Sequence, residues 1–287
     1  MRVKKFIAAM MIVVAAVGMI GCSKKQRETQ EQNATYSNLV DVESQKGIEK
    51  ELLEAGVSEE SVRIFLEWVQ AYNANVKSAS AFGEGYQEMV TPTVDYNDVY
   101  LKEEYKEDGS MIMDMNCRLT AFLLYREFLT VTNQTDEYDP YLMFDMEEME
   151  NEEHFKEIRK EKDKFIGFFN PVDVEENTNI ENHIQAIQDA WRDRGVQLAE
   201  NEKMALITMY LHDQYENKRF VGHTGVALYQ ENGVVFVEKY GFNQPFQITR
   251  FADEEAMVQY LLSRPDLVGD GTEEPVIVMK NSTVISE

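Results

Sequence analysis

Two cysteines in the sequence, Cys22 and Cys117, point to two different kinds of chemistry. Cys22 directly follows an apolar N-terminal run, a position suited to lipid attachment. If Cys22 is acylated, Cys117 has no disulfide partner in a compartment that oxidises thiols. A leftover thiol there is either buried and inert or kept because it reacts, and its neighbours decide between these alternatives.

The residues around Cys117 favour a reactive thiolate. Asn116, or Asp114 before it, is a typical N-cap residue, and the apolar stretch 117–129 predicts a buried central helix. Cys117 then lies in the first turn, where free backbone N–H groups and the helix dipole stabilise an anion and lower a thiol pKa. The Cys117 N–H group, with Asn116 nearby, would also bind an oxyanion. The alternative is that Cys117 is one more small apolar residue in the core.

Among the four histidines, His223 has the surroundings that best suit a general base. It begins a predicted strand and is flanked by Gly222 and, two residues later, Gly225, which allow another group to approach the ring closely. The other three are predicted to face solvent, with His212 as the reserve candidate because it ends a strand: His154, His183 and His212.

Glu238 is the one carboxylate inside the otherwise apolar predicted strand 234–240, across a hairpin from His223. A carboxylate in that place would fix the tautomer and orientation of the imidazole. The alternative is an ion pair between Glu238 and a neighbouring cation.

The hairpin register decides whether Glu238 reaches His223. A four-residue loop at 230–233 sets Gly225 opposite Glu238, which places Glu238 roughly 7–8 Å from His223 on the diagonal. A two-residue turn at 232–233 separates them by roughly 13 Å. In that second register two residues just past the strand would orient the imidazole instead: Asn243 and Gln244.

The elements that must position these residues change type along the chain. Helices are predicted over residues 44–56, 58–72, 116–129, 180–194 and 253–262. Strands are predicted over residues 204–211, 221–229, 234–240, 246–251 and 275–280. Helices in the first half and consecutive antiparallel strands in the second predict an α+β fold.

The N-terminus predicts a lipoprotein signal peptide over residues 1–21. Three basic residues precede the apolar run 6–20, which at about 15 residues is shorter than the roughly 20 that span a membrane. Gly21-Cys22 is similar to the end of a lipobox, so we expect the mature chain to be lipid-anchored through Cys22 to the outer face of a bacterial membrane. Ordinary secretory cleavage is the alternative. Polar residues 22–37 predict a flexible tether, and residues 38–287 a single α+β domain.

Composition narrows the possible partners. The formal net charge of −24 argues against nucleic acid, whose phosphates bind clustered Lys and Arg. The acidity is explained most simply by a solvated surface. No cofactor is implied, because the chain has no His-Glu-x-x-His run and no Gly-rich phosphate loop. A zinc site is an alternative reading, with three ligands: Cys117, His223 and Glu238.

Several segments resemble the domain-of-unknown-function 4300 family of lipoproteins from Gram-positive bacteria. They are residues 36–41, 116–122, 222–226, 236–239 and 245–247. The resemblance covers nearly the whole mature chain and implies its location and the extent of its domain.

A looser resemblance is to the papain-like and NlpC-type cysteine hydrolases. In those enzymes a Cys opens a helix, a His begins a strand, and a polar residue on the next strand orients the His. Cys117, His223 and Glu238 follow in that order, although the residues that usually surround the nucleophile of NlpC-type enzymes are missing. The resemblance implies a Cys-bearing central helix against an antiparallel sheet, with an N-terminal helical portion.

Together these observations predict a nucleophile at Cys117, a general base and acid at His223, and an orienting carboxylate at Glu238. The expected reaction is cleavage or transfer of an amide or peptide bond, with a peptide or peptidoglycan stem as substrate. The alternative is a non-catalytic lipoprotein that keeps a papain-like shell and binds a peptide or wall fragment.

Overall fold

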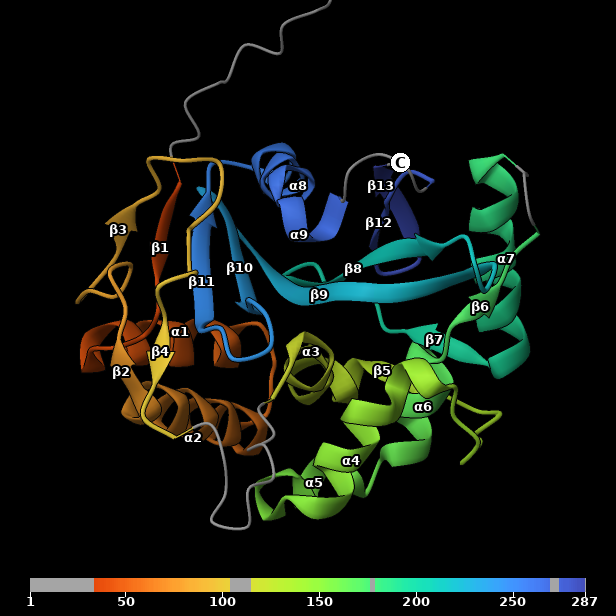
Figure 1. The fold of residues 1–287 in the computed structure, drawn as a ribbon, viewed down its shortest axis with the longest axis horizontal. Helices are drawn as coiled ribbons and strands as arrows, with labels where there is room; N and C mark the ends of the chain where they lie inside the picture. The colour runs from red at the N-terminus through yellow and green to blue at the C-terminus, as the bar shows by residue number, and fades with distance from the viewer. Residues whose placement is uncertain (1–33, 104–114, 176–178, 269–273, 287) are drawn as a thin grey trace, which may run out of the picture. The chain divides into compact units, whose positions relative to one another are not determined.

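The computed structural model describes residues 34–103, 115–175, 179–268 and 274–286. The predicted signal peptide and Cys22 lie outside these residues. A nine-stranded sheet runs through the described domain in the order β13-β12-β8-β9-β10-β11-β1-β3, with β6 pairing on β9 (Figure 1). Every pairing in it is antiparallel.

The four long strands of the sheet follow one another along the chain. They are β8 Met204–Asp213, β9 Lys218–Gln230, β10 Gly233–Lys239 and β11 Phe246–Phe251. The shorter strands are β1 Thr35–Ser37, β3 Gln87–Glu88, β6 Val172–Asp173, β12 Ile277–Lys280 and β13 Thr283–Ser286. Two small separate sheets pair β2 Val76–Ser78 with β4 Tyr100–Leu101, and β5 Leu129–Val131 with β7 Val196–Leu198.

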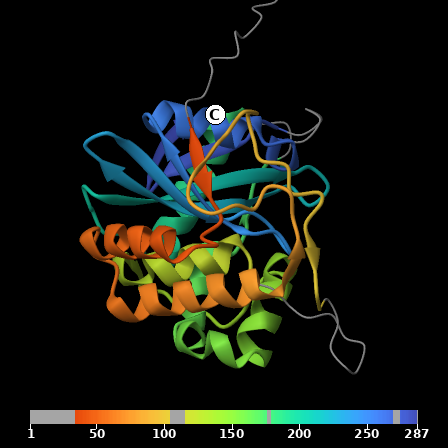
Figure 2. The same cartoon turned by 90° about the vertical axis from the view of Figure 1, so that its left-hand side faces the viewer.

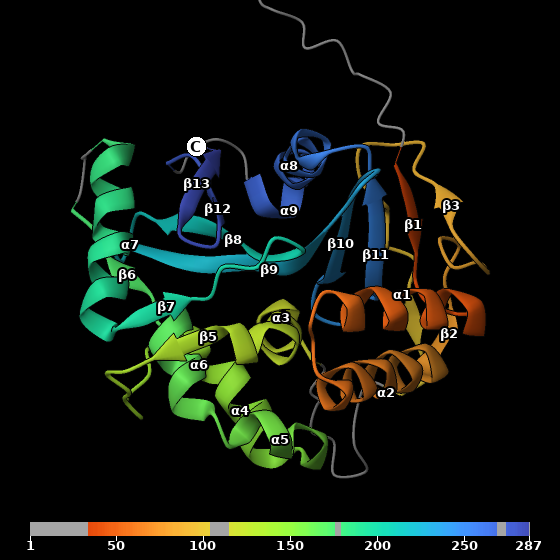
Figure 3. The ribbon, with the colours of Figure 1, turned by 180° about the vertical axis from the view of Figure 1, so that it is seen from behind.

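Helices cover both faces of the sheet. On one face lie α1 Val42–Glu54, α2 Glu59–Asn75, α3 Cys117–Tyr125, α4 Met143–Asn151, α5 Lys156–Arg159 and α6 Lys162–Phe169 (Figures 1 and 2). On the other lie α8 Glu254–Ser263 and α9 Pro265–Val268. The helix α7 Ile180–Arg194 stands at one end of the sheet, and α1 and α2 lie at the other (Figure 3).

Alternating side chains of the strands fill two cores, one on each face. Val235 and Val237 of β10 belong to the larger core, which the helices α1 to α7 cover. Val234 and Phe236, one position along, belong to the smaller core beneath α8. This alternation follows from the two-residue repeat of a strand, and it explains why the strand sequences are apolar on both faces.

The helix α3 is the central element of the larger core, as its apolar sequence predicts. The Asn116 side chain accepts a hydrogen bond from the Leu119 N–H at 3.0 Å, so the helix begins at Cys117. It contacts both β9 and β10, and Arg118 donates to the main-chain oxygen of Val221 in β9 at 3.0 Å. α3 is shorter than predicted, since a short 3₁₀ helix follows at Arg126–Phe128 and β5 begins directly after it.

The predicted α+β class is confirmed, with helices and a large antiparallel sheet. One boundary differs from the prediction. Residues 35–37, expected to be part of the tether, form β1, which pairs with β11 and places Ser37 in the interior. A three-residue strand is too short to produce a visible alternation, so the sequence pattern could not reveal it.

Candidate active site

The structure holds Cys117 at the N-terminus of α3 through contacts on both sides of it. Asp145 of α4, which is fully buried, accepts a hydrogen bond from Asn116 Nδ2 at 2.9 Å and another from Arg118 Nε at 3.0 Å. Arg118 Nη2 lies 2.5 Å from the second oxygen of the same carboxylate. The residues before and after Cys117 are therefore fixed by one side chain, and Cys117 as a whole residue is 9% exposed.

The hairpin between β9 and β10 has the register that brings His223 and Glu238 together. Tyr229 pairs with Val234, and Gln230 with Gly233, so the turn itself is only two residues, 231–232. The predicted pairing register is thus confirmed with a shorter loop. Gly233 has a φ of 136°, which its lack of a side chain allows.

His223 and Glu238 lie just beyond the end of this hairpin ladder, whose last pair is Val226 with Val237. His223 Nε2 is 2.7 Å from Glu238 Oε2. Both side chains are buried, at 2% and 0% exposure. The Glu238 carboxylate therefore lies against the imidazole ring, as expected from the predicted diagonal arrangement.

The Cys117 thiol and His223 lie close enough for each to change the pKa of the other. Because His223 Nε2 faces Glu238, the ring nitrogen left for the thiol is Nδ1. Burial raises the pKa of the Cys117 thiol, but the hydrogen bond and charge of His223 and the charge of Arg118 outweigh it, so this pKa lies below its ordinary value. The position at the first turn of α3 favours an anion as well.

Opposing influences set the pKa values of His223 and Glu238. Burial and the charge of Arg264 lower the pKa of His223, but its hydrogen bonds to Cys117 and Glu238 raise it above its ordinary value. Burial raises the pKa of Glu238, yet Arg264 and His223 lower it below its ordinary value. Glu238 is therefore a carboxylate, and the imidazole between it and the thiol can accept a proton.

The alternative orienting residues lie elsewhere. Asn243 and Gln244 are in the turn between β10 and β11, where the main-chain oxygen of Asn243 accepts from the Tyr72 hydroxyl and that of Gln244 from Lys239 Nζ. The partner of His223 is Glu238 instead. Another expectation was wrong, because His183, predicted at the surface, is 1% exposed and accepts a hydrogen bond from Arg219 Nε at 3.0 Å.

The sequence did not indicate the other side chains of the hydrogen-bond network around Glu238. Arg264 Nη1 lies 2.7 Å from Glu238 Oε2, and the Tyr260 hydroxyl donates to Oε1 at 2.6 Å. Gln247 Nε2 donates to the Tyr260 oxygen at 2.9 Å, and the Tyr96 hydroxyl donates to Gln247 Oε1 at 2.7 Å. In the sequence, Gln247 and Tyr260 stand out only as polar residues within apolar segments. Nothing in the sequence around Arg264 indicates a role in the site.

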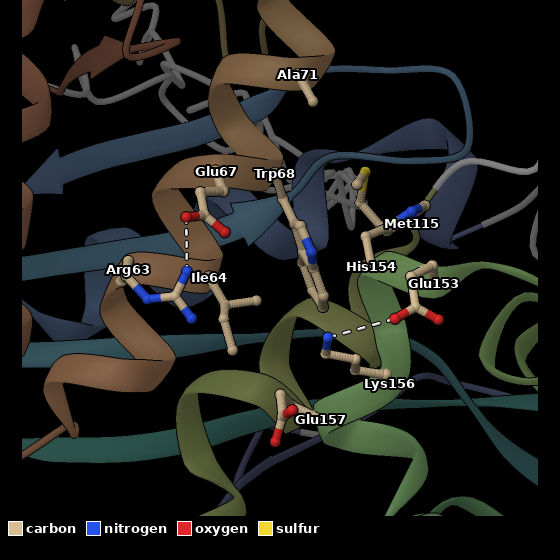
Figure 4. Close-up of a pocket in the computed structure, with 10 residues that line it drawn as sticks. All are labelled: Arg63, Ile64, Glu67, Trp68, Ala71, Met115, Glu153, His154, Lys156 and Glu157. Atoms are coloured by element: carbon tan, nitrogen blue, oxygen red, sulfur yellow. Dashed lines mark hydrogen bonds and ion pairs between the residues drawn. The ribbon is translucent and has the colours of Figure 1, made fainter.

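A groove of about 620 Å³ lies close to the start of α3 (Figure 4). Trp68, Ile64 and Met115 form its apolar part, and Met115 is two residues before Cys117. Its remaining lining residues are Arg63, Glu67, Ala71, Glu153, His154, Lys156 and Glu157. Two ion pairs border it, Arg63 with Glu67 at 2.6 Å and Lys156 with Glu153 at 3.3 Å. Its lining therefore has one carboxylate, Glu157, more than its cations, and none of the three predicted site residues Cys117, His223 and Glu238 lines it.

The arrangement does not favour the zinc alternative. The permanent cation of Arg264 lies against the Glu238 carboxylate and would repel a metal ion there. Within the four described ranges, no group of three His, Cys, Asp or Glu side chains is placed to hold a metal ion. None of the helices in the described part of the chain is both long and apolar enough to cross a bilayer.

The residues 35–285 match the model of a family described as a domain of unknown function, DUF4300. This match covers most of the 287 residues, so the chain belongs to the DUF4300 family. It also includes β1, in agreement with the ordered start of the sheet at Thr35. No curated protein and no solved structure matches the chain.

Proposed function

We propose that this chain is a surface-anchored lipoprotein with a papain-like Cys-His-Glu site that cleaves or transfers an amide or peptide bond. The observation that carries the proposal is the hydrogen bond between His223 and Glu238 beside the Cys117 thiol, which lies at a helix N-terminus and whose pKa His223 lowers. The order of these residues and the packing of α3 against an antiparallel sheet support the papain-like assignment.

In the proposed reaction, His223 Nδ1 takes the thiol proton, and Cys117 Sγ attacks the carbonyl carbon of the substrate. The negative oxygen of the tetrahedral intermediate is stabilised by the free N–H groups at the start of α3. His223 returns the proton to the leaving amine, and the C–N bond breaks to give a thioester. Water, deprotonated by His223, then hydrolyses the thioester and releases the acid. Glu238 stays ionised throughout and holds Nε2–H.

Alkylation with iodoacetamide tests the nucleophile without knowledge of the substrate. A thiol activated by His223 reacts at pH 6 at least about tenfold faster than the same thiol in His223→Ala, because only the thiolate attacks. Loss of the reaction in Cys117→Ser assigns the label to that thiol. Hydrolysis of peptides and peptidoglycan fragments by the wild type, absent in Cys117→Ala, would then identify the reaction and its substrate class.

A non-catalytic binding protein is the second candidate, and the 9% exposure of Cys117 favours it. A binder of peptides or wall fragments would keep the shell of the site and leave the thiol shielded. Its Cys117 would react slowly, and the rate would be the same in His223→Ala at every pH. That result would overturn the hydrolase proposal.

The proposed anchor is a lipid on Cys22, at the outer face of the cell membrane. Cells fed radiolabelled palmitate should label the wild type and leave Cys22→Ala unlabelled. The Cys22→Ala protein should also leave the membrane fraction. Labelling that survives in Cys22→Ala would refute the anchor and would leave the proposal for Cys117 untouched.

A further inference from the structure

Arg264 directly follows α8 and its side chain is fully buried. Its guanidinium donates to the main-chain oxygen of Tyr240 at 2.7 Å and to Asp266 Oδ2 at 2.6 Å. It also stacks over the Tyr240 ring, with its carbon 3.6 Å from the ring centroid. These two bonds come from Nη2, and the other terminal nitrogen, Nη1, lies 2.7 Å from Glu238 Oε2. Contacts on several sides therefore fix this cation against the carboxylate that orients His223.

One oxygen of Glu238 serves two partners. His223 Nε2 and Arg264 Nη1 each lie 2.7 Å from Oε2, and the two nitrogens are 3.4 Å apart. Because a guanidinium does not lose its proton, Arg264 can only donate, and it keeps Glu238 ionised. Oε2 therefore accepts from both nitrogens.

The charge balance of this group affects proton transfer. A buried carboxylate without a counter-charge strongly favours the protonated form of a neighbouring imidazole, which then releases its proton poorly. A buried cation without a counter-charge prevents protonation of the imidazole. Glu238 and Arg264 together present no net charge to His223, so their combined effect is that of a neutral hydrogen-bond acceptor.

We propose that Arg264 is a positioning residue of the Cys117–His223 pair, acting through Glu238. It holds the carboxylate in line with His223 Nε2 and cancels its charge, so that the imidazole can both take the thiol proton and give it back. This inference rests on the proposed function, because it assigns a role within the same site.

The charged and titratable groups that act on the pair come from every element around it. They are Arg118 on α3, Asp145 on α4, Glu238 on β10, Tyr260 on α8, and Arg264 and Asp266 after it. Arg118 is paired with Asp145, and Arg264 is shared between the buried Glu238 and the half-exposed Asp266, whose charge solvent screens. The Glu238–Arg264 pair is thus the one in direct contact with the imidazole.

The test is the pH dependence of Cys117 alkylation by iodoacetamide in the full-length protein. In Arg264→Met, the uncompensated carboxylate stabilises the imidazolium, so the pH of half-maximal rate falls by about one unit or more. In Glu238→Gln, the unpaired guanidinium raises the pH of half-maximal alkylation rate by a similar amount. The double variant Glu238→Gln/Arg264→Met has no net charge there either, and its profile should return close to that of the wild type.

Two further variants separate charge from packing. Arg264→Lys keeps the charge and should keep the midpoint while lowering the rate. Arg219→Met removes another fully buried arginine, one that donates to His183, and should lower stability without moving the midpoint. Urea denaturation of each variant establishes that it is folded. If Arg264→Met does not fold, the comparison of Glu238→Gln with the double variant gives the same answer.

The inference is overturned by an unshifted profile in Arg264→Met, or by a double variant that keeps the shift of Glu238→Gln. Either result would mean that Arg264 has only a packing role. A wild-type profile that is identical to that of His223→Ala is a different outcome, because it contradicts the proposed function itself.

Discussion

A single glycine, Gly225, lets β9 pack closely against Phe236 and Val237 of β10, next to Glu238. A Cβ built on Gly225 would lie 2.5 Å from the Phe236 ring and 2.7 Å from the Val237 main-chain oxygen, so neither neighbour could move away easily. We expect Gly225→Ala to lower the free energy of unfolding by about 2 kcal/mol through overpacking, and to slow alkylation of Cys117.

Urea denaturation and the alkylation rate measure these two effects. Gly47 of α1 is the matched control, since a Cβ there meets nothing within 4 Å. Gly47→Ala should stabilise the protein by up to about 1 kcal/mol and leave the alkylation rate unchanged. Equal stability of Gly225→Ala and the wild type would contradict the tight fit.

The residues predicted for the site were recognisable because each is unusual in its segment. Cys117 is an unpaired thiol at a helix start, and Glu238 is the one carboxylate in an apolar strand. Arg264 was not recognisable, because an arginine between a helix and a proline resembles an ordinary solvated helix end. Likewise His183 lies in charged sequence, and only its tertiary contact with Arg219 accounts for its burial.

At the scale of elements, the start of α3 sets the position of the thiol. Asn116→Ala removes both the cap on the Leu119 N–H and the hydrogen bond to Asp145. We expect the free energy of unfolding to fall by about 1 kcal/mol or slightly more, with at least a several-fold loss in alkylation rate of Cys117. Urea denaturation and iodoacetamide kinetics measure both.

The cap of α7 provides a control for that experiment. Asn179 accepts from the Asn182 N–H in the same way, but at a helix on the end of the sheet. Asn179→Ala should therefore lower stability by a similar amount and leave the thiol as reactive as in the wild type. Equal alkylation rates in both variants would mean that the cap of α3 does not position Cys117.

Long periodic elements were predictable to within a few residues, and short ones were not. The predicted ranges 180–194 and 246–251 coincide with α7 and β11. The strands β1, β3 and β13 were missed because two to four residues carry no recognisable alternation. Their existence depends on the edges of the sheet that they cover, which is tertiary information.

At the scale of the whole molecule, the His183–Arg219 contact makes folding sensitive to acid. Burial and the charge of Arg219 lower the pKa of His183 from its ordinary value of 6.5. Below that value the unfolded chain binds a proton that the folded chain does not, so stability is lost as the pH falls. We expect the wild type to lose about 1 kcal/mol more than His183→Gln between pH 7 and pH 5.

Urea denaturation at the two pH values measures this difference. The comparison with His183→Gln is needed because His223, whose pKa is raised, changes stability in the opposite direction: its contribution is present at acid pH and lost as the pH rises. Identical pH dependence in the two proteins would show that His183 is protonated as easily in the folded chain as in the unfolded one.

The path of β1 limits where the domain can work if Cys22 carries the proposed lipid. β1 begins on the α8 side of the sheet and runs toward α1, so the chain enters the domain on the side away from α3 (Figure 1). Only residues 23–34 separate Cys22 from β1, and at full extension they reach about 45 Å. Within that reach, a peptide bound by the domain would have to come from the innermost zone of the envelope.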